Sequence, residues 1–242
     1  MKTRIGVIAA LPREVKGFLD RLGVLDRETS GGLPLYRGIH EEKEILVLIS
    51  GVGMKKARIA ARTLIHRHRP DLIFSAGFAG GLDPSLALGD TVIPSRIVDQ
   101  SDARIDAPQE IHTKLLSARP GTAAGSLLST PRFIPDASEK KELFRRYDAL
   151  AVDMESAATA LEAQATGVPH LALRVISDTA DQTLPPLSGF LDAQGDIMPM
   201  RAVLFFARHP RRLIPVLRFF KGMGRAADSL TDLLVTAVTV LP

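Results

Sequence analysis

The sequence predicts an α/β fold in which helices are layered on a β-sheet. Short apolar runs rich in β-branched residues alternate along the chain with longer stretches of helical periodicity, a pattern typical of such folds. The chain has 242 residues, 45% of them hydrophobic, and no repeat or low-complexity linker divides it. This is enough apolar material for one large core. We therefore expect a single domain over residues 1–242, with a basic and apolar helical segment at about 197–242.

The apolar runs define the expected strands, and the runs with a period near 3.6 define the expected helices. β-branched residues favour strands because they pack well on a pleated surface. Strands are expected over residues 4–9, 44–50, 71–75, 91–94, 126–129, 149–153 and 169–177. Helices are expected over residues 12–22, 54–66, 139–147 and 155–166.

Two glycine-rich stretches, 51–53 and 77–81, are expected as turns that follow strands. Glycine lets backbone N–H groups approach an anion or a sugar hydroxyl closely, and Gly77 is a candidate substrate contact for this reason. The stretch from Gly51 to Lys56 lacks the third glycine of a dinucleotide-binding fingerprint. Each stretch is thus either a ligand-binding loop or only a turn.

Composition excludes several kinds of site. The chain has no Cys, which rules out disulfides and thiolate metal sites, and its six His form no HExxH motif. We expect no metal and no cofactor. No apolar stretch approaches the roughly 20 residues of a membrane span, and the apolar run near the start is too short for a signal peptide. The expected location is the cytoplasm.

The net charge of +4 is unevenly distributed. Residues 197–227 contain seven Lys or Arg and no Asp or Glu, so the rest of the chain is mildly acidic. A localised basic patch is therefore expected rather than a nucleic-acid-binding surface. The apolar residues between these charges suit either an anionic membrane surface or a core or oligomer helix with a solvated basic side. Pro210 and Pro215 are expected to break the segment into short helices.

Three carboxylates stand where open α/β sheets place their ligands, at strand ends or in the first turn after a strand. Glu14 follows the first strand, Glu155 follows Ala151-Val-Asp-Met154, and Asp178 follows the apolar run Leu171-Ala-Leu-Arg-Val-Ile176. Each alone is as easily a helix cap. Their repetition at three strand ends favours a site.

Four ordered motifs resemble those of methylthioadenosine/S-adenosylhomocysteine nucleosidases and their nucleoside phosphorylase relatives. They are Gly6-Val-Ile-Ala-Ala-Leu-Pro-Arg-Glu14-Val, Ser75-Ala-Gly-Phe-Ala-Gly-Gly-Leu82, Val152-Asp-Met-Glu155-Ser-Ala-Ala and Arg174-Val-Ile-Ser-Asp178. The resemblance runs from residue 1 to about residue 183. It implies a three-layer phosphorylase/nucleosidase-like fold with a central mixed β-sheet flanked by helices, and an enzyme that cleaves the purine N-glycosidic bond.

The resemblance also implies roles for the residues around the base. Asp178, helped by Ser177, would protonate or hydrogen-bond the purine N7. Phe133 would stack on the base, and the backbone of Ile134 would read its edge. Acid catalysis of this kind suits the chemistry, because the departing purine carries negative charge. Without its neighbours, Phe133 is as well explained as a core aromatic.

At the sugar, the resemblance gives Glu155 to the ribose hydroxyls, with Met154 against the ring. Glu14 would orient and deprotonate an attacking water. A carboxylate near the ribose also shelters the oxocarbenium-like charge that develops at C1′.

The chain departs from the family pattern where phosphorylases bind phosphate. Glu14 and Ser75 stand at the usual arginine positions, and Phe78 replaces a hydroxyl. Water is therefore one nucleophile to consider and inorganic phosphate, as co-substrate, the other. Phe78 makes the sugar end of the pocket more apolar, which favours a greasy 5′ substituent.

The short central region, a Leu-Pro-Pro-Leu187 segment and the basic apolar tail together resemble the hopanoid-associated phosphorylases. This resemblance implies release of adenine from adenosylhopane, a lipid-linked adenine nucleoside, with peripheral contact at the inner face of the membrane. The alternatives are a methylthioadenosine/S-adenosylhomocysteine nucleosidase and a non-catalytic nucleoside-binding, membrane-associated protein. We expect a homo-oligomer, with a dimer favoured, and no nucleic-acid partner.

Overall fold

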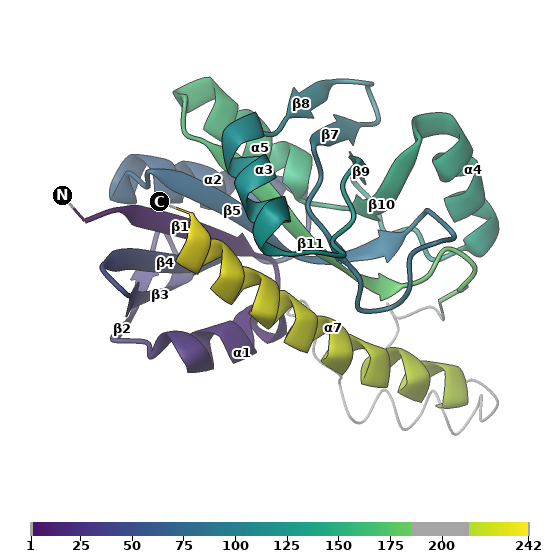
Figure 1. The fold of residues 1–242 in the computed structure, drawn as a ribbon, viewed down its shortest axis with the longest axis horizontal. Helices are drawn as coiled ribbons and strands as arrows, with labels where there is room; N and C mark the ends of the chain where they lie inside the picture. The colour runs from purple at the N-terminus through teal and green to yellow at the C-terminus, as the bar shows by residue number, and fades with distance from the viewer. Residues whose placement is uncertain (1, 185–212, 242) are drawn as a thin grey trace.

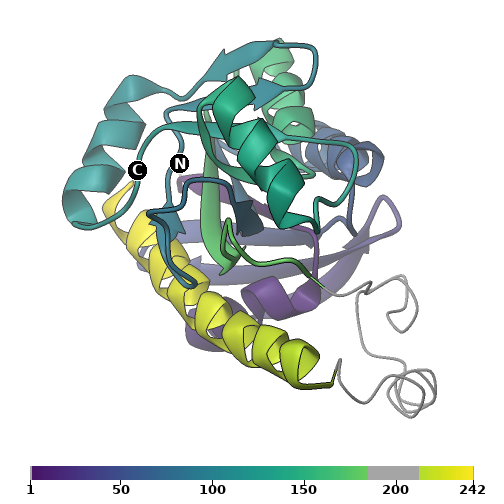
Figure 2. The same cartoon turned by 90° about the vertical axis from the view of Figure 1, so that its right-hand side faces the viewer.

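A computed structural model describes residues 2–184 and 213–241, with side chains of the last helix described from residue 222 onward. Within these residues, eleven strands form one mixed sheet, and helices cover both of its faces (Figures 1 and 2). The predicted three-layer α/β architecture is confirmed.

The strands are β1 Arg4–Ala9, β2 Asp26–Ser30, β3 Leu33–His40, β4 Lys43–Ile49, β5 Leu72–Gly81, β6 Thr91–Val92, β7 Arg96–Asp99, β8 Arg104–Asp106, β9 Ser126–Ser129, β10 Ala149–Asp153 and β11 His170–Asp178. The helices are α1 Pro12–Leu22, α2 Met54–His68, α3 Gln109–Ala118, α4 Ala137–Tyr147, α5 Ser156–Thr166 and α7 Leu213–Val240. The strand order is β2-β3-β4-β1-β5-β10-β9-β7-β8, and β11 pairs with both β5 and β6.

The central strand β5 is shared between two neighbours. Its residues 73–80 pair in parallel with β11, and Gly80 and Gly81 pair antiparallel with Val152 and Ala151 of β10. β1 runs parallel to β5 on the other side. The carboxyl ends of β1, β5 and β11 therefore meet at one edge, and the end of β10 reaches the same place.

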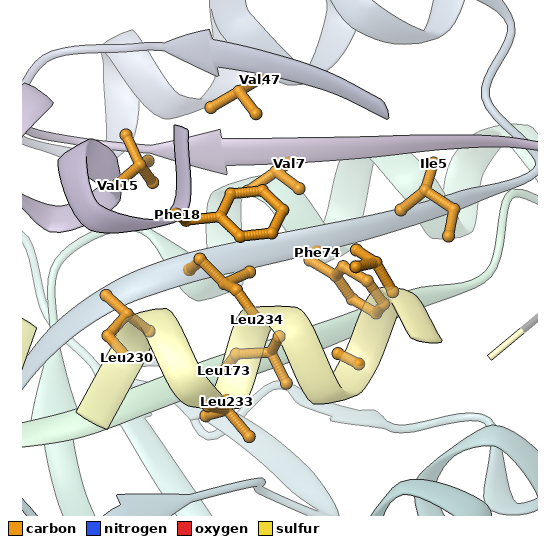
Figure 3. Packing of buried hydrophobic residues seen from close by; sticks show 14 of the residues in the cluster. Ile5, Val7, Val15, Phe18, Val47, Phe74, Leu173, Leu230, Leu233 and Leu234 are labelled. Atoms are coloured by element: carbon orange, nitrogen blue, oxygen red, sulfur yellow. The ribbon is translucent and has the colours of Figure 1, made fainter. Parts of the chain in front are cut away.

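Alternating side chains divide the core between the two faces of the sheet. Val7 and Phe74 point to the face covered by α1 and α7, where they pack with Phe18 and with leucines of α7, including Leu230 (Figure 3). Residues of opposite parity, such as Ile8, pack under α2 and α5. This period of two is the one expected of strands buried on both faces.

The C-terminal helix α7 lies beside α1 across one face of the sheet (Figures 1 and 2). Lys43 of β4 donates hydrogen bonds to the carbonyls of Val238, Thr239 and Leu241, which satisfies acceptors at the end of the helix. The expected break at Pro215 is wrong. Pro215 is the third residue of α7, and proline is tolerated there because a first-turn N–H has no acceptor within the helix.

Other parts of the basic segment, including Pro210 and the arginines at 208, 211 and 212, lie outside the described residues, as do residues 185–187 of the Leu-Pro-Pro-Leu187 stretch. Among the helices that the structure describes, none combines the length and the apolar character needed to cross a membrane.

The structure adds four strands and one helix to those expected from sequence: β2, β3, β7, β8 and α3. Apolar runs cannot reveal β2, since its Asp26-Arg-Glu-Thr-Ser30 sequence is polar and exposed except at its last residue. The expected turn over 77–81 is also wrong, because these residues continue β5. Pairing with β11 and β10 supplies the backbone partners that keep this glycine-rich stretch extended.

Candidate active site

The carboxylate of Glu14 lies at the end of β1, in the first turn of α1. Glu14 is only 5% exposed. Its Oε2 accepts a hydrogen bond from the N–H of Leu11 at 2.8 Å, and its Oε1 accepts one from the N–H of Phe78 at 3.1 Å. Glu14 therefore caps α1 and at the same time reaches β5. Burial raises the pKa of Glu14, although the two backbone hydrogen bonds and the charges of Arg174 and Arg13 oppose this rise.

Glu155 stands at the N-cap position of α5, yet its side chain makes no capping hydrogen bond to that helix. Instead, Oε1 accepts a hydrogen bond from the N–H of Gly53 at 2.7 Å, and Oε2 accepts one from the N–H of Met154 at 3.3 Å. Burial and the negative charge of Asp153 raise the pKa of Glu155, while the charge of Arg174 opposes the rise. The explanation of Glu155 as a helix cap is thus wrong, because its carboxylate is turned toward the loop before α2.

Asp178 ends β11 and is 2% exposed. Its Oδ1 accepts a hydrogen bond from the hydroxyl of Ser177 at 2.6 Å, and its Oδ2 accepts one from the ammonium of Lys140 at 2.5 Å. Both oxygens of this carboxyl group are thus held by side chains, and Asp178 caps none of the described helices. Sequence reasoning missed Lys140, because it lies on α4 among charged and exposed neighbours and no local signal distinguishes it from them.

A buried arginine lies close to the two glutamates. Arg174 of β11 is 1% exposed and donates two hydrogen bonds to Asp153 Oδ2, at 3.0 and 2.6 Å. Its remaining N–H groups donate to Ser75, Ser156 and the carbonyl of Leu173. Its positive charge lowers the pKa of both Glu14 and Glu155 against the effect of burial. Sequence reasoning assigned no role to Arg174, although an arginine inside an otherwise apolar strand is a rare residue that needs partners.

Glu14, Glu155 and Arg174 line one small cavity, together with Ser50, Ser75 and Gly77 and neighbouring residues of β1 and β5. Its volume is about 10 Å³. Space of this size accommodates about one water molecule. The structure therefore brings two of the three predicted catalytic carboxylates around a volume suited to a small nucleophile.

Two glycines of β5 make room for the carboxylates. A Cβ atom at Gly77 would lie 2.8 Å from Glu14 Oε1, and one at Gly80 would lie 3.2 Å from Asp178 Oδ2. In this structure Gly77 therefore provides space beside Glu14. The N–H that follows it, on Phe78, is already engaged by the same carboxylate.

The predicted substrate-binding residues occupy different surroundings. Phe133, in the loop between β9 and α4, is 46% exposed, so its interpretation as a core aromatic is wrong. Ile134 is buried and belongs to the apolar cluster that includes Val152 of β10. Phe78 is partly buried and packs against Leu184 and Met223. The N–H of Met154 donates a hydrogen bond to Glu155, and the hydroxyl of Ser177 donates one to Asp178.

Among the described residues, no group of three or more His, Asp or Glu is arranged to hold a metal ion. The ionisable side chains of the site instead have local partners. Glu14 accepts a hydrogen bond from the N–H of Phe78 on β5, Arg174 pairs with Asp153, and Lys140 pairs with Asp178. Such side chains suit transfer of protons at a polar bond inside a pocket.

Comparison with known proteins agrees with this arrangement. The chain is 32% identical over 199 residues to the 5′-methylthioadenosine/S-adenosylhomocysteine nucleosidase of Halalkalibacterium halodurans, covering 74% of this chain and 86% of that protein. It is 28% identical over 198 residues to the nucleosidase of the same name from Staphylococcus haemolyticus, covering 73% and 87%.

Solved structures share the fold over almost the whole chain. The Helicobacter pylori 5′-methylthioadenosine/S-adenosylhomocysteine nucleosidase superposes with a TM-score of 0.79 at 20% identity, covering 100% of both chains. The futalosine hydrolase of Helicobacter pylori superposes with a TM-score of 0.78 at 21% identity, covering 99% of this chain and 98% of that one.

The family described as the phosphorylase superfamily matches residues 4–195, which include all the predicted site residues. The match spans well over half of the 242 residues. The chain therefore belongs to the phosphorylase superfamily, as an enzyme of the nucleoside phosphorylase and nucleosidase class.

Proposed function

We propose that the protein hydrolyses the N-glycosidic bond of a 5′-substituted adenosine and releases adenine. The observation that carries this proposal is the cavity of about 10 Å³ between Glu14, Glu155 and Arg174. The names of the relatives support the same chemistry, because they include nucleosidases of 5′-methylthioadenosine and S-adenosylhomocysteine and a futalosine hydrolase.

On the sugar side, Glu14 takes a proton from the attacking water. A raised pKa suits this role, because a general base works best when its pKa lies near the working pH. Glu155 binds the ribose hydroxyls, with Met154 beside the ring. The negative charge of these carboxylates stabilises the positive charge that develops at C1′ as the bond to N9 breaks.

On the base side, Asp178 delivers a proton to N7 of the departing purine. Ser177 holds one oxygen of this acid through its hydroxyl. Phe133 stacks on the base, and its large exposed fraction is consistent with a ring that is available to a ligand. The backbone of Ile134 reads the edge of the purine.

Two features favour water over inorganic phosphate as the nucleophile. The cavity has room for about one water molecule, whereas phosphate is several times larger. The N–H groups of Arg174 already bond to protein atoms, so this cation has no donors left for a phosphate. Glu14 would also repel a phosphate dianion.

The surroundings of Phe78 support an apolar 5′ substituent. Its ring packs against Leu184 and Met223, and its N–H donates to Glu14, so an apolar cluster lies next to the proposed base. Adenosylhopane is our first candidate substrate on this ground. The nucleosidase relatives favour methylthioadenosine or S-adenosylhomocysteine as the second candidate.

The test incubates the purified protein with adenosylhopane and, separately, with methylthioadenosine, each with and without phosphate. We expect adenine and a free sugar in both phosphate-free reactions, with higher kcat/KM for the more apolar substrate. A sugar 1-phosphate formed only when phosphate is present would contradict hydrolysis. Failure to release adenine from either substrate would contradict the proposed function.

The membrane part of this proposal rests on residues 197–227, which carry seven basic side chains and no acidic one. Each basic residue near an anionic bilayer contributes about 1 kcal/mol of attraction, so several together would hold the protein reversibly. We test this by liposome co-sedimentation with and without acidic lipid, at low and high salt, with Arg211, Arg212 and Arg218 changed to Gln. Binding that ignores lipid charge, salt and these three residues would contradict electrostatic docking.

The expected homodimer is also a proposal. Two exposed apolar side chains, Val52 at 39% and Ile59 at 54%, lie in and just after the loop that bonds to Glu155, and they support an interface near the site. Light scattering of the purified protein should give twice the monomer mass. Replacement of Ile59 by Glu should shift it toward the monomer mass.

A further inference from the structure

Lys140 is a fully buried cation whose partners belong to the segment carrying the acid. It is the only residue of α4 that is buried. Its ammonium donates to Asp178 Oδ2 at 2.5 Å, to the carbonyl of Thr179 at 2.8 Å and to the carbonyl of Gln182 at 3.1 Å. Three acceptors match the three hydrogens of an ammonium group, so this side chain is satisfied entirely by β11 and the residues just after it.

A buried ion pair of this kind is poorly explained by stability. Taking two charges out of water is costly, and an apolar pair of similar size often stabilises a fold as well or better. The side chains of Lys140 and Asp178 are 0% and 3% exposed, so both charges bear this cost. Because the pair includes the carboxyl group expected to protonate the base, a role in the reaction explains it better than stability does.

Among the described residues, one cation contacts the carboxyl group of Asp178. Oδ1 is held by the Ser177 hydroxyl, and Oδ2 faces the ammonium. On the other side, a Cβ at Gly80 would already lie 3.2 Å from Oδ2. The ammonium is therefore the proton-bearing cation in contact with the carboxyl group among the described residues.

We infer that Lys140 supplies the proton that Asp178 passes to the departing base, and that it positions Asp178 for this transfer. The inference rests on the proposed function. A proton moves from Lys140 Nζ to Asp178 Oδ2, and the carboxyl group gives its proton to purine N7. The bond between N9 and C1′ breaks, and its electron pair stays with the purine, which leaves neutral. After release, the amine regains a proton from solvent and Glu14 loses the one it took from water, so the cycle consumes one water.

This pairing makes the pH dependence distinctive. A lysine side chain ordinarily releases its proton at higher pH than a carboxylic acid does, so the pH dependence of acid catalysis distinguishes the two kinds of donor. The other charged groups of the surrounding described elements have their own partners or face solvent. On α4, Glu139 pairs with Arg132, and the side chains at 141, 142, 145 and 146 are exposed. On the neighbouring elements, Asp153 pairs with Arg174, and Asp181 is exposed and interacts with the charge of Lys140.

The experiment compares Lys140→Met, Lys140→Arg and the wild type. Lys141→Met is the matched control, because Lys141 is the next residue of α4 and is exposed. Each protein is assayed with methylthioadenosine and with a methylthioribosyl p-nitrophenyl ether, whose leaving group departs without a proton. Profiles of kcat/KM against pH are recorded for both substrates, and thermal unfolding verifies that each variant is folded.

We expect Lys140→Met to lower kcat/KM for methylthioadenosine by roughly 10²-fold, the usual scale of acid catalysis, while activity on the nitrophenyl ether stays within about threefold. Its alkaline limb with methylthioadenosine should move to lower pH. Lys140→Arg should also fail to restore activity with adenine as leaving group, because a guanidinium keeps the charge but does not give up its proton. Lys141→Met should match the wild type.

Three results would overturn the inference: an unchanged kcat/KM of Lys140→Met on methylthioadenosine, equal losses on both substrates with an unshifted pH profile, or full rescue by Lys140→Arg. Equal losses with an unshifted profile would mean that Lys140 has a structural role, and full rescue by Lys140→Arg would mean that only its charge matters. If Lys140→Met does not fold, the Arg variant and the wild-type pH profile still decide, since a wild-type alkaline limb in the acidic range contradicts a proton held by lysine. Failure of the wild type to release adenine would instead contradict the proposed function.

Discussion

Gly77 of β5 lies so close to the carboxylate of Glu14 that a Cβ atom at this position would stand 2.8 Å from Glu14 Oε1. Real Cβ atoms do not approach an oxygen so closely, so one of the two groups must move when a side chain is added. The carboxylate is also fixed by the N–H groups of Leu11 and Phe78. The glycine therefore sets the position of the proposed general base.

Gly77→Ala should accordingly lower kcat by at least tenfold, a loss of about 1.4 kcal/mol of transition-state stabilisation, because Glu14 is displaced from its water. Steady-state kinetics with methylthioadenosine measure the effect. Gly224→Ala on α7 is the control, since no described atom outside the backbone of its own helix lies within 4 Å of the place that a Cβ would take. Wild-type turnover in folded Gly77→Ala would show that Glu14 tolerates the shift.

Asp178→Asn keeps the size of the side chain and removes the transferable proton. Turnover should fall by about 10²-fold or more while the fold survives. Asp26→Asn, at an exposed position of β2, serves as the matched control and should retain full activity. Near-normal turnover in Asp178→Asn, with circular dichroism unchanged, would remove Asp178 from the mechanism.

Glu155→Gln should lower turnover with ribonucleosides far more than it lowers the melting temperature, because the charge that binds the hydroxyls and faces C1′ is lost. With a 2′-deoxy substrate, Glu155→Gln should lower turnover less, because this substrate already lacks one of the hydroxyls that Glu155 binds. An equal loss on both substrates would separate Glu155 from the 2′-hydroxyl. A variant that unfolds but keeps its activity per folded molecule would make Glu155 structural.

Phe78→Ser should weaken the preference for a long 5′-alkyl adenosine over methylthioadenosine. Each buried CH₂ contributes about 0.8 kcal/mol, or roughly fourfold in kcat/KM. If several CH₂ groups of the 5′-alkyl substituent lose their contact with Phe78, kcat/KM for that substrate should fall by a large factor. Phe78→Leu keeps an apolar side chain and should retain most of the preference. The ratio of the two kcat/KM values is the measurement, and an unchanged ratio in the Ser variant would leave Phe78 as packing.

The lowered pKa of His170 predicts that the protein loses stability in acid. Burial and the charge of Arg174 lower its pKa from 6.5 to about 3, and its Nε2 lies 3.0 Å from the hydroxyl of Thr159. Between these two pH values the unfolded chain binds a proton that the folded protein does not, so the free energy of unfolding falls as pH falls, by about 1.4 kcal/mol per pH unit at most.

Urea unfolding of the wild type and of His170→Gln between pH 7 and pH 4 tests this expectation. The variant should show a flatter dependence on pH, whereas His66→Gln, at an exposed position of α2, should follow the wild type. Parallel curves for His170→Gln and the wild type would mean that other groups cause the acid sensitivity.

The sequence by itself located the three carboxylates and the layered architecture. Strand ends can be read from apolar runs, and parallel strands bring their carboxyl ends to one edge whatever the details of packing. This is why Glu14 and Asp178 can be singled out from sequence, whereas the place of Glu155 also depends on β10, which pairs antiparallel with β5. The same reasoning predicted α1 over Pro12–Leu22, whose amphipathic period is strong.

Tertiary structure decided which cations lie beside those carboxylates. Arg174 is held by Asp153, 21 positions away, and by Ser75, 99 positions away, and Lys140 contacts Asp178 across 38 positions, so no local pattern encodes these contacts. It also decided that residues 77–81 form a strand, because their hydrogen-bond partners come from β10 and β11. Likewise, the exposed position of Phe133 depends on how the loop before α4 lies, since the apolar residues around it allowed either a core or a surface ring.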